Sequence, residues 1–268
     1  MKTIVITGST RGIGFGLARE FLKRDCSVVV NGRSQAAVEK AANGLAATHS
    51  GERVLGHAAD VSIYEQVQGL WEAAQARFGR VDIWINNAGV AHPDNEPMWD
   101  QAPELMRAVV NLNLLGSLYG LRVAAQGMKA QGGGTIYDVE GFGSNGRTRK
   151  GLGLYGATKA AVRFIARSLE ADAAEWPAPL KFGTISPGIV TTDLLAGQYA
   201  GRPEEFERAK RIFNLLGDKV ETVTPFIAEK VLAGELTIAW LTQGKVMWRF
   251  LTANFSKRDL FSEGANVS

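Results

Sequence analysis

The segment TIVITGSTRGIG, residues 3–14, determines the fold that the sequence predicts. Its first five residues form a short apolar run that is typical of a buried strand. Three glycines follow at Gly8, Gly12 and Gly14, and a helical pattern begins near Ile13. A strand, a glycine-rich turn and a helix in this order are typical of a turn that binds the phosphates of a dinucleotide. The glycines let the backbone approach the phosphates, and the helix N-terminus offers free amides.

A second glycine cluster, GFGSNG at residues 141–146, matches the spacing G-x-G-x-x-G more closely. Its context differs, because the next residues show no helical period until about Leu154. A phosphate-binding turn must open a helix directly. We therefore interpret residues 141–153 as a loop at the carboxyl end of a strand, where active sites of open α/β sheets are built.

Apolar runs alternate with helical patterns along most of the chain. Such runs predict strands buried on both faces, and repeated β-α-β units predict one Rossmann-type, doubly wound parallel α/β sheet with helices on both faces. We expect a single domain over residues 1–268, with a substrate loop or lid at about 190–222 and an apolar C-terminal extension at about 223–268. The expected strands are 3–7, 27–31, 53–60, 81–86, 134–139 and 180–186, and the expected helices are 13–24, 35–48, 61–78, 103–130, 154–175 and 202–211.

Composition excludes several classes of function. The 30 basic and 27 acidic residues leave a formal charge of only +3, and no basic run indicates nucleic-acid binding. Cys26 is the single cysteine, which excludes an internal disulfide, and His49, His57 and His92 lack the spacing of metal ligands. We expect no metal, no membrane span and no targeting segment. A cytoplasmic location follows, or the plastid stroma if a transit peptide was removed.

Four motifs follow one another along the chain: the glycine turn, NNAG at residues 86–89, YGATK at residues 155–159, and SPGIVTT at residues 186–192. Each motif alone is weak. Together they resemble the short-chain dehydrogenase/reductase family over about residues 1–195.

The resemblance implies roles for the matching residues. Tyr155 is expected to protonate a substrate carbonyl oxygen. Lys159 is expected to bind the nicotinamide ribose and to favour the tyrosine anion by its charge. Asn113 is expected to hold a water on a proton relay. Expected contacts with the cofactor, besides Tyr155 and Lys159, are Gly8, Ser9, Thr10, Arg11, Gly12, Ile13, Gly14, Arg33, Ser34, Asp60, Val61, Asn87, Ala88, Gly89, Pro187, Gly188, Ile189 and Thr192.

One position departs from the family pattern. The strand before the tyrosine commonly ends N-I-S-S in the family, and its second serine binds the carbonyl; here the residues are DVEG, with Gly141 in place of that serine. The chlorophyll b reductase branch has a similar shape, and VEGFGS, WINNAG, SPGIVTTDLL, RIFNLLGDKVETV and WRFLT all resemble it. By that resemblance Ser144 takes the carbonyl-binding role. Glu140 is either a polar wall of the pocket or a structural acid.

Cofactor preference depends on the end of the second strand. An enzyme that selects NAD usually carries an acid there, whereas this chain has Gly32 followed by Arg33. Arg33 and Arg11 are suited to binding a 2′-phosphate, with help from Ser34, so we expect NADPH or NADP⁺.

The predicted function is NADPH-dependent reduction of a carbonyl to an alcohol. The narrower resemblance implies the 7-formyl group of chlorophyll b or a related chlorin as substrate. Two alternatives stay open, namely a reductase of an unrelated aldehyde or ketone and a catalytically silent regulator that binds NADP(H). We expect a small-molecule substrate and a homo-oligomer, either a dimer or a tetramer.

Overall fold

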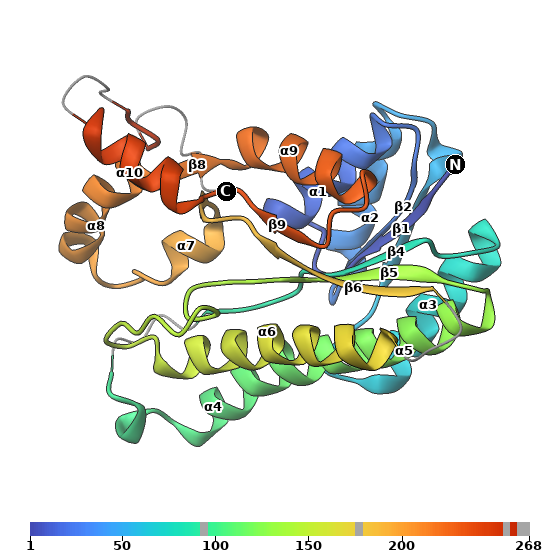
Figure 1. Ribbon diagram of the computed structural model, residues 1–268, viewed down its shortest axis with the longest axis horizontal. Coiled ribbons are helices and arrows are strands. Elements are labelled where there is room, and N and C mark those ends of the chain that lie inside the picture. The colour runs from blue at the N-terminus through green and yellow to red at the C-terminus, as the bar shows by residue number, and fades with distance from the viewer. Residues whose placement is uncertain (92–95, 175–178, 254–257, 262–268) are drawn as a thin grey trace.

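A seven-stranded sheet forms the centre of the protein (Figure 1). The computed structural model describes residues 1–91, 96–174, 179–253 and 258–261. Every neighbouring pair of strands in this sheet is parallel, which confirms the predicted doubly wound architecture. In sheet order the strands are β3 (Val54–Ala58), β2 (Ser27–Gly32), β1 (Thr3–Ile6), β4 (Ile83–Asn86), β5 (Gly134–Val139), β6 (Leu180–Ser186) and β9 (Thr237–Ala239).

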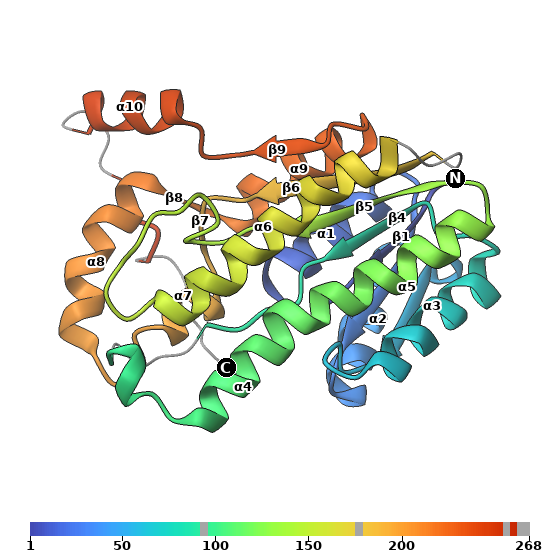
Figure 2. The ribbon, with the colours of Figure 1, turned by 60° about the horizontal axis from the view of Figure 1, so that its bottom comes forward.

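Helices cover both faces of the sheet (Figures 1 and 2). Strand residues alternate between the two layers: Ile4 and Ile6 pack in one buried cluster, and Val5 packs in the other. Because both faces of the sheet are covered, the central strands β1 and β4 are fully buried and mostly apolar. One layer contains α1 (Gly12–Leu22), α2 (Gln35–Ala46) and α9 (Val220–Leu232), and the other contains α3 (Tyr64–Phe78), α5 (Gly116–Ala130) and α6 (Gly153–Ala174).

The helix expected over residues 103–130 is divided into three parts. α4 (Pro103–Val110) leads through a π-helical turn (Asn111–Leu115) into α5. These 28 residues meet the length and mean hydropathy of a membrane-crossing helix, although the sequence predicts no membrane span. A helix that packs on a sheet meets the same two criteria, and Ala124 and Met128 of α5 are fully buried in the core.

Residues 220–239 supply a helix and a strand that the sequence did not predict. α9 packs against α1 at Gly16, where a Cβ would lie 2.4 Å from a methyl carbon of Val220. β9 then extends the sheet by pairing with β6. Some residues named in the sequence predictions lie outside the described residues, namely His92, Glu175 at the end of a predicted helix, Phe255 and residues 262–268.

The remaining elements gather at one end of the molecule, on the left in Figures 1 and 2. A two-stranded parallel sheet joins β7 (Ile189–Thr191) to β8 (Gly217–Lys219). Three helices surround it: α7 (Asp193–Gly197), α8 (Pro203–Leu216) and α10 (Gln243–Leu251). α8 corresponds to the amphipathic helix predicted at 202–211, but it begins one residue later and extends to Leu216.

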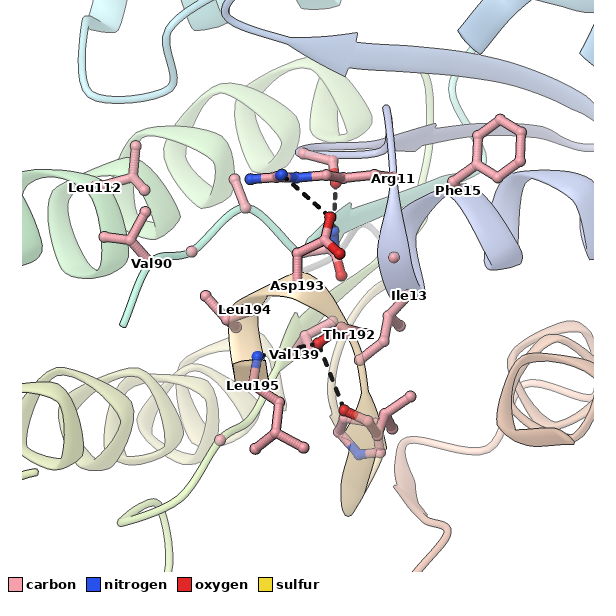
Figure 3. Close-up of a pocket in the computed structure, with 18 of the residues that line it drawn as sticks. Arg11, Ile13, Phe15, Val90, Leu112, Val139, Thr192, Asp193, Leu194 and Leu195 are labelled. Atoms are coloured by element: carbon pink, nitrogen blue, oxygen red, sulfur yellow. Dashed lines mark hydrogen bonds and ion pairs between the residues drawn. The ribbon is translucent and has the colours of Figure 1, made fainter. Parts of the chain in front are cut away.

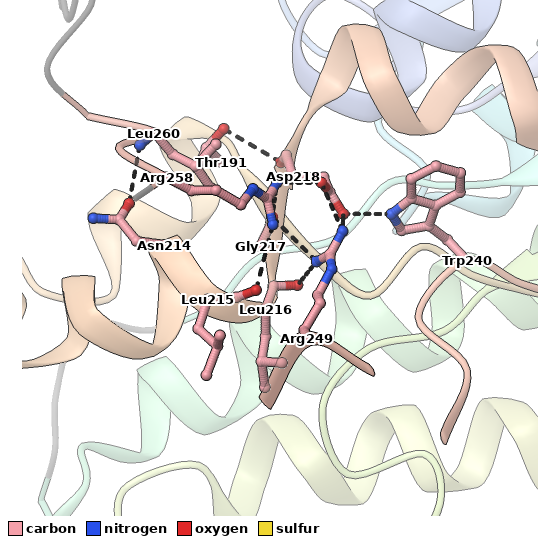
Figure 4. A network of polar contacts seen from close by, with 10 residues as sticks. All are labelled: Thr191, Asn214, Leu215, Leu216, Gly217, Asp218, Trp240, Arg249, Arg258 and Leu260. Carbon is pink, nitrogen blue, oxygen red and sulfur yellow. Dashed lines mark hydrogen bonds and ion pairs between the residues drawn. The ribbon is translucent and has the colours of Figure 1, made fainter. Parts of the chain in front are cut away.

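A buried ionic network holds this end together (Figure 4). Asp218 of β8 accepts hydrogen bonds from Arg249 at 2.7 and 3.0 Å, from Arg258 at 2.6 Å, and from the indole nitrogen of Trp240 at 2.6 Å. Burial raises the pKa of Asp218, but these hydrogen bonds outweigh burial and hold the pKa below its ordinary value. The carboxylate therefore joins β8 to three points of the C-terminal segment.

Replacing Asp218 by Asn should lower the free energy of unfolding at pH 7 by about 3–5 kcal/mol, because two arginines lose their buried partner. A depressed pKa contributes stability above the unfolded pKa, near 4, and this contribution is lost as the pH falls through the folded pKa. Urea denaturation should therefore show the difference between wild type and Asp218→Asn shrinking below about pH 4. Glu104→Gln, which breaks an exposed pair with Arg107, serves as control and should cost under about 1 kcal/mol. A pH-independent difference would contradict the account.

Candidate active site

A large cavity follows the carboxyl ends of the strands. The strand order reverses between β1 and β4, and ligands of open α/β sheets bind at such a switch point. The cavity measures about 1220 Å³ and is lined by the glycine turn after β1 and by the ends of β2, β4, β5 and β6. Residues of β7 and α7 close it from the other side (Figure 3).

The glycine turn fits the pyrophosphate of a dinucleotide. Gly8 and Gly12 adopt left-handed φ angles of 61° and 59°. A Cβ at Gly8 would lie 2.8 Å from the Cα of Ala88, so the chain has no room for a side chain there. The N-cap residue Arg11 makes no side-chain cap, and the first turn of α1 contains no acid. The first amides of α1 are therefore available to an anion.

The cavity gathers most of the residues that the sequence singled out. Five of them do not line it: Ser9, Gly14, Asp60, Asn113 and Ser144. The predicted residues that do line it are Gly8, Thr10, Arg11, Gly12, Ile13, Arg33, Ser34, Val61, Asn87, Ala88, Gly89, Tyr155, Lys159, Pro187, Gly188, Ile189 and Thr192.

Three of the five residues off the cavity wall have evident structural contacts. The Ser9 hydroxyl donates to the carbonyl of Ile6 at 2.7 Å and accepts from the amide of Asn31 at 2.9 Å. Asp60 accepts from both the amide and the hydroxyl of Ser62. A Cβ at Gly14 would lie 2.6 Å from the carbonyl oxygen of Gly8. These three residues therefore support the turns beside the cavity without lining it.

Tyr155 and Lys159 lie one turn apart on α6, and each is 6% exposed. The ammonium of Lys159 donates to the carbonyl oxygen of Val139 at 2.9 Å. Burial raises the pKa of Tyr155 to about 12 and lowers the pKa of Lys159 to about 8. The direction for Tyr155 is opposite to the one expected from a neighbouring cation, because burial is the dominant influence on the phenol.

Asn113 lies in the π-helical turn and is 1% exposed. Its side-chain amide nitrogen donates to the carbonyl of Val90 at 2.9 Å, and its oxygen accepts from the amide of Val90 at 2.8 Å. A Cβ at Gly89 would lie 3.4 Å from this oxygen and 3.6 Å from the Lys159 nitrogen. The side chain of Asn113 thus fixes the loop after β4 next to Lys159.

Gly141 packs directly against Tyr155. A Cβ at Gly141 would lie 2.2 Å from the Tyr155 hydroxyl oxygen, so the glycine leaves the space that this hydroxyl occupies. Ser144 lies further along the same loop and does not line the cavity. Its hydroxyl donates to the carbonyl of Gly141 at 2.6 Å and accepts from the amide of Gly141 at 3.0 Å. These two hydrogen bonds close the turn, and the carbonyl-binding role expected for Ser144 stays a prediction that requires the hydroxyl to leave them.

Basic residues surround one end of the cavity. Arg33 and Ser34 line it as expected, and Lys40 lines it as well, which the sequence did not indicate. The Ser34 hydroxyl caps α2 by accepting from the amide of Ala37 at 3.4 Å. The guanidinium of Arg11 pairs with Asp193 at 3.2 Å across the cavity mouth (Figure 3). Both partners are largely exposed, so solvent weakens this pair.

The opposite end of the cavity is mostly apolar. Its walls include Val90, Leu112, Leu194 and Leu195 (Figure 3) together with Phe142, Leu152 and Phe213. Three polar side chains interrupt this wall, those of Glu140, Arg149 and Gln198. The Glu140 carboxylate is buried and lies 3.4 Å from the Arg163 guanidinium. Glu140 is thus both a polar wall of the pocket and a structural acid, the two roles that the sequence left open.

Comparisons with known proteins agree with this geometry. A family model described as short chain dehydrogenase matches residues 2–202. A chloroplastic chlorophyll(ide) b reductase of Arabidopsis thaliana is 37% identical over 232 residues, which are 86% of this chain and 65% of that protein. A probable chlorophyll(ide) b reductase of Oryza sativa subsp. japonica is 32% identical over 98% of this chain and 54% of its own length. The chain thus spans between half and two thirds of these relatives.

Solved structures give the same fold with different cofactors. A 3-ketoacyl-(acyl-carrier-protein) reductase from Brucella melitensis complexed with NADH is 28% identical, with a TM-score of 0.73 over 92% of this chain and 93% of that one. An alcohol dehydrogenase from Thermococcus sibiricus complexed with 5-hydroxy-NADP is 26% identical, with a TM-score of 0.71 over 89% and 94%. The fold alone therefore does not select between NAD and NADP.

Substituting Gly141 by Ala should displace the Tyr155 hydroxyl, because the new methyl group would need the same space. Overpacking of this kind typically costs about 1–3 kcal/mol of stability. Thermal unfolding of Gly141→Ala and Gly44→Ala checks this. Gly44 lies within α2, where an added methyl group would meet no atom within 4 Å, so its substitution should be neutral or stabilising. An unchanged melting temperature in Gly141→Ala would show that Tyr155 does not depend on the glycine.

Proposed function

The chain belongs to the short-chain dehydrogenase/reductase family, and on that premise we propose that it is an NADPH-dependent reductase that converts a carbonyl group to an alcohol. The proposal rests mainly on one observation: Tyr155 and Lys159 both line a cavity that also contains the uncapped N-terminus of α1. Charged and titratable groups buried in a cleft with shifted pKa values are typical of catalytic sites.

The glycine turn, the first amides of α1 and Arg33 would hold the dinucleotide, and Lys159 would bind its nicotinamide ribose. When bound, the reduced nicotinamide supplies a hydride to the carbonyl carbon. Tyr155 gives its phenolic proton to the carbonyl oxygen; with its pKa raised to about 12, the phenol carries that proton at neutral pH. Lys159, with its pKa lowered to about 8, is mostly charged at pH 7 and stabilises the phenolate that is left.

The proposed substrate is the formyl group of chlorophyll b or a related chlorin. Two observations support it: the relatives above are named chlorophyll(ide) b reductases, and the walls of the cavity near Tyr155 are mostly apolar. Reduction of an unrelated aldehyde or ketone is the second candidate, because the same walls accept other apolar carbonyl compounds. A catalytically silent regulator is the third candidate. The packing of Gly141 against the Tyr155 hydroxyl disfavours it, because a protein that only binds NADP(H) does not need a phenol held in a fixed position.

An assay of NADPH and NADH oxidation with chlorophyll b and with simple aldehydes tests the proposal. We expect turnover with NADPH and a formyl-bearing chlorin. Turnover with simple aldehydes alone would support the second candidate, and cofactor binding without turnover on any carbonyl would support the third.

Assembly and location are also proposals. We propose a homo-oligomer, a dimer or a tetramer, because α10 exposes four large apolar side chains close together, those of Met247, Trp248, Phe250 and Leu251, and exposed apolar patches are typical of interaction sites. The Arabidopsis relative is named as chloroplastic, which supports a plastid location for this protein, and a cytoplasmic location is the alternative proposal.

Arg33→Asp should weaken NADPH binding by roughly 1.5–3 kcal/mol, the value of a hydrogen bond to a charged group, and leave NADH binding nearly unchanged. Isothermal titration with both cofactors measures the two affinities. Arg11→Gln is the matched comparison, and its effect should be smaller because Asp193 already occupies the Arg11 guanidinium. Equal losses for NADPH and NADH in Arg33→Asp would contradict the assignment of the 2′-phosphate to Arg33.

Tyr155→Phe should lower kcat by about 10²–10⁴, the usual contribution of general acid catalysis, with NADPH affinity close to that of the wild type. Steady-state kinetics and cofactor titration check both parts. Tyr137→Phe is the control, because the Tyr137 hydroxyl donates to the carbonyl of Glu235 and does not line the cavity. A Tyr155→Phe variant that keeps more than about a tenth of wild-type kcat would exclude the tyrosine as proton donor.

A further inference from the structure

Arg149 lies at the apolar end of the cavity, in the loop that connects β5 to α6. Main-chain hydrogen bonds tie this part of the loop to α6. The carbonyl of Arg149 accepts from the amide of Leu152 at 3.1 Å, and the carbonyl of Leu152 accepts from the amide of Gly156 at 2.8 Å. Since Gly156 follows Tyr155 in the first turns of α6, Arg149 is held in a fixed relation to the proposed proton donor.

The guanidinium of Arg149 is oriented by Tyr199. One of its terminal nitrogens donates to the Tyr199 hydroxyl at 2.8 Å, and its central carbon lies 5.8 Å from the centre of the ring. Tyr199 itself is buried and packs edge-on against Phe213, with ring centres 5.8 Å apart. Because this contact restricts the long side chain, a ligand of Arg149 would cost less side-chain entropy to bind.

Unlike two other arginines near the cavity, Arg149 forms no ion pair with a carboxylate of the described residues. Arg202 stacks on the same tyrosine ring but pairs with Glu205 at 2.9 Å, and Arg11 pairs with Asp193. Within the described part of the chain, no carboxylate lies within ion-pair distance of Arg149. Its single contact with Tyr199 leaves most of its five N–H donors available, and these donors form the planar fork that matches a carboxylate.

The surroundings of Arg149 define the rest of the ligand. Phe142, Leu152, Leu195 and Phe213 line the same end of the cavity and expose apolar surface. A substrate that fills this space therefore needs an apolar body, and a group that satisfies Arg149 needs a negative charge. An aldehyde or ketone with both features would place its carbonyl at Tyr155 and its charge at the loop.

We propose that Arg149 forms a carboxylate subsite, so that the substrate of this protein is an apolar carbonyl compound that also carries a carboxylic acid. The proposal rests on the proposed reductase function and narrows its substrate class. Among chlorins it favours one with a free carboxylic acid over chlorophyll b, whose carboxyl groups are esterified. The carboxylate lies away from the reacting carbonyl and is bound equally in the ground state and in the transition state. Its loss should therefore raise KM and leave kcat nearly unchanged.

Matched pairs of an acid and its ester test the subsite. The probes are 4-formylbenzoate and its methyl ester, and 4′-formylbiphenyl-4-carboxylate and its methyl ester, which place the carboxylate at two distances from the carbonyl. The wild type should prefer at least one acid over its ester. Arg149→Gln should reduce that preference by about tenfold, the lower end for a charged hydrogen bond because Arg149 is exposed to solvent.

Arg147→Gln is the control, because Arg147 is an exposed arginine of the same loop that does not line the cavity. It should keep the wild-type preference, which separates a subsite from a general effect of positive charge. An acid preference that is absent from the wild type, equal in wild type and Arg149→Gln, or equally lost in both variants would overturn the proposal.

A binding measurement separates this proposal from the proposed function. Titration of 4-(hydroxymethyl)benzoate and 4′-(hydroxymethyl)biphenyl-4-carboxylate into the protein with NADP⁺ needs no turnover. If the wild type reduces neither these aldehydes nor the formyl-bearing chlorin, the reductase proposal fails, and binding of either acid that weakens in Arg149→Gln alone would still support the subsite. Binding that is absent, or equal in wild type and Arg149→Gln, would overturn the subsite whatever the turnover.

Discussion

The close approach between the end of β5 and the first turns of α6 fixes the groups around Tyr155. Lys159 reaches across to the carbonyl of Val139, and the Tyr155 hydroxyl lies where a side chain at residue 141 would otherwise be. Gly143 approaches α6 equally closely, since a Cβ there would lie 2.4 Å from the Cα of Gly156. Packing thus requires glycine at residues 141 and 143, and Ser144 closes the turn by its hydrogen bond to Gly141.

The cavity combines two chemically different ends along one row of strand termini. At one end an uncapped helix, Arg33 and Lys40 favour the phosphates of a dinucleotide. At the other end apolar walls favour an organic substrate, and burial shifts the pKa values of Tyr155 and Lys159. The proposed hydride transfer needs this arrangement, because the cofactor and the carbonyl must meet at one point away from bulk water.

Local sequence predicts the elements that are stabilised locally. β5 and β6 have the predicted bounds because their apolar runs are buried on both faces. The sequence did not predict β9, because three residues are too short for a recognisable strand pattern. These residues form a strand because they pair with β6. The position of Ser144 depends on Gly143, whose φ of 96° turns the loop back on itself. Arg149 could not be predicted as a site residue because its partner Tyr199 lies 50 residues further along the chain.

The central claim is that this cavity transfers a hydride to a carbonyl carbon while Tyr155 protonates the oxygen. Isotope transfer from NADPH deuterated at C4 of the nicotinamide tests it most directly, with mass spectrometry of the alcohol product as the readout. The account predicts one deuterium bonded to the carbinol carbon and a Tyr155→Phe variant that forms almost no labelled alcohol. Alcohol that forms without deuterium from either C4 position would contradict the account.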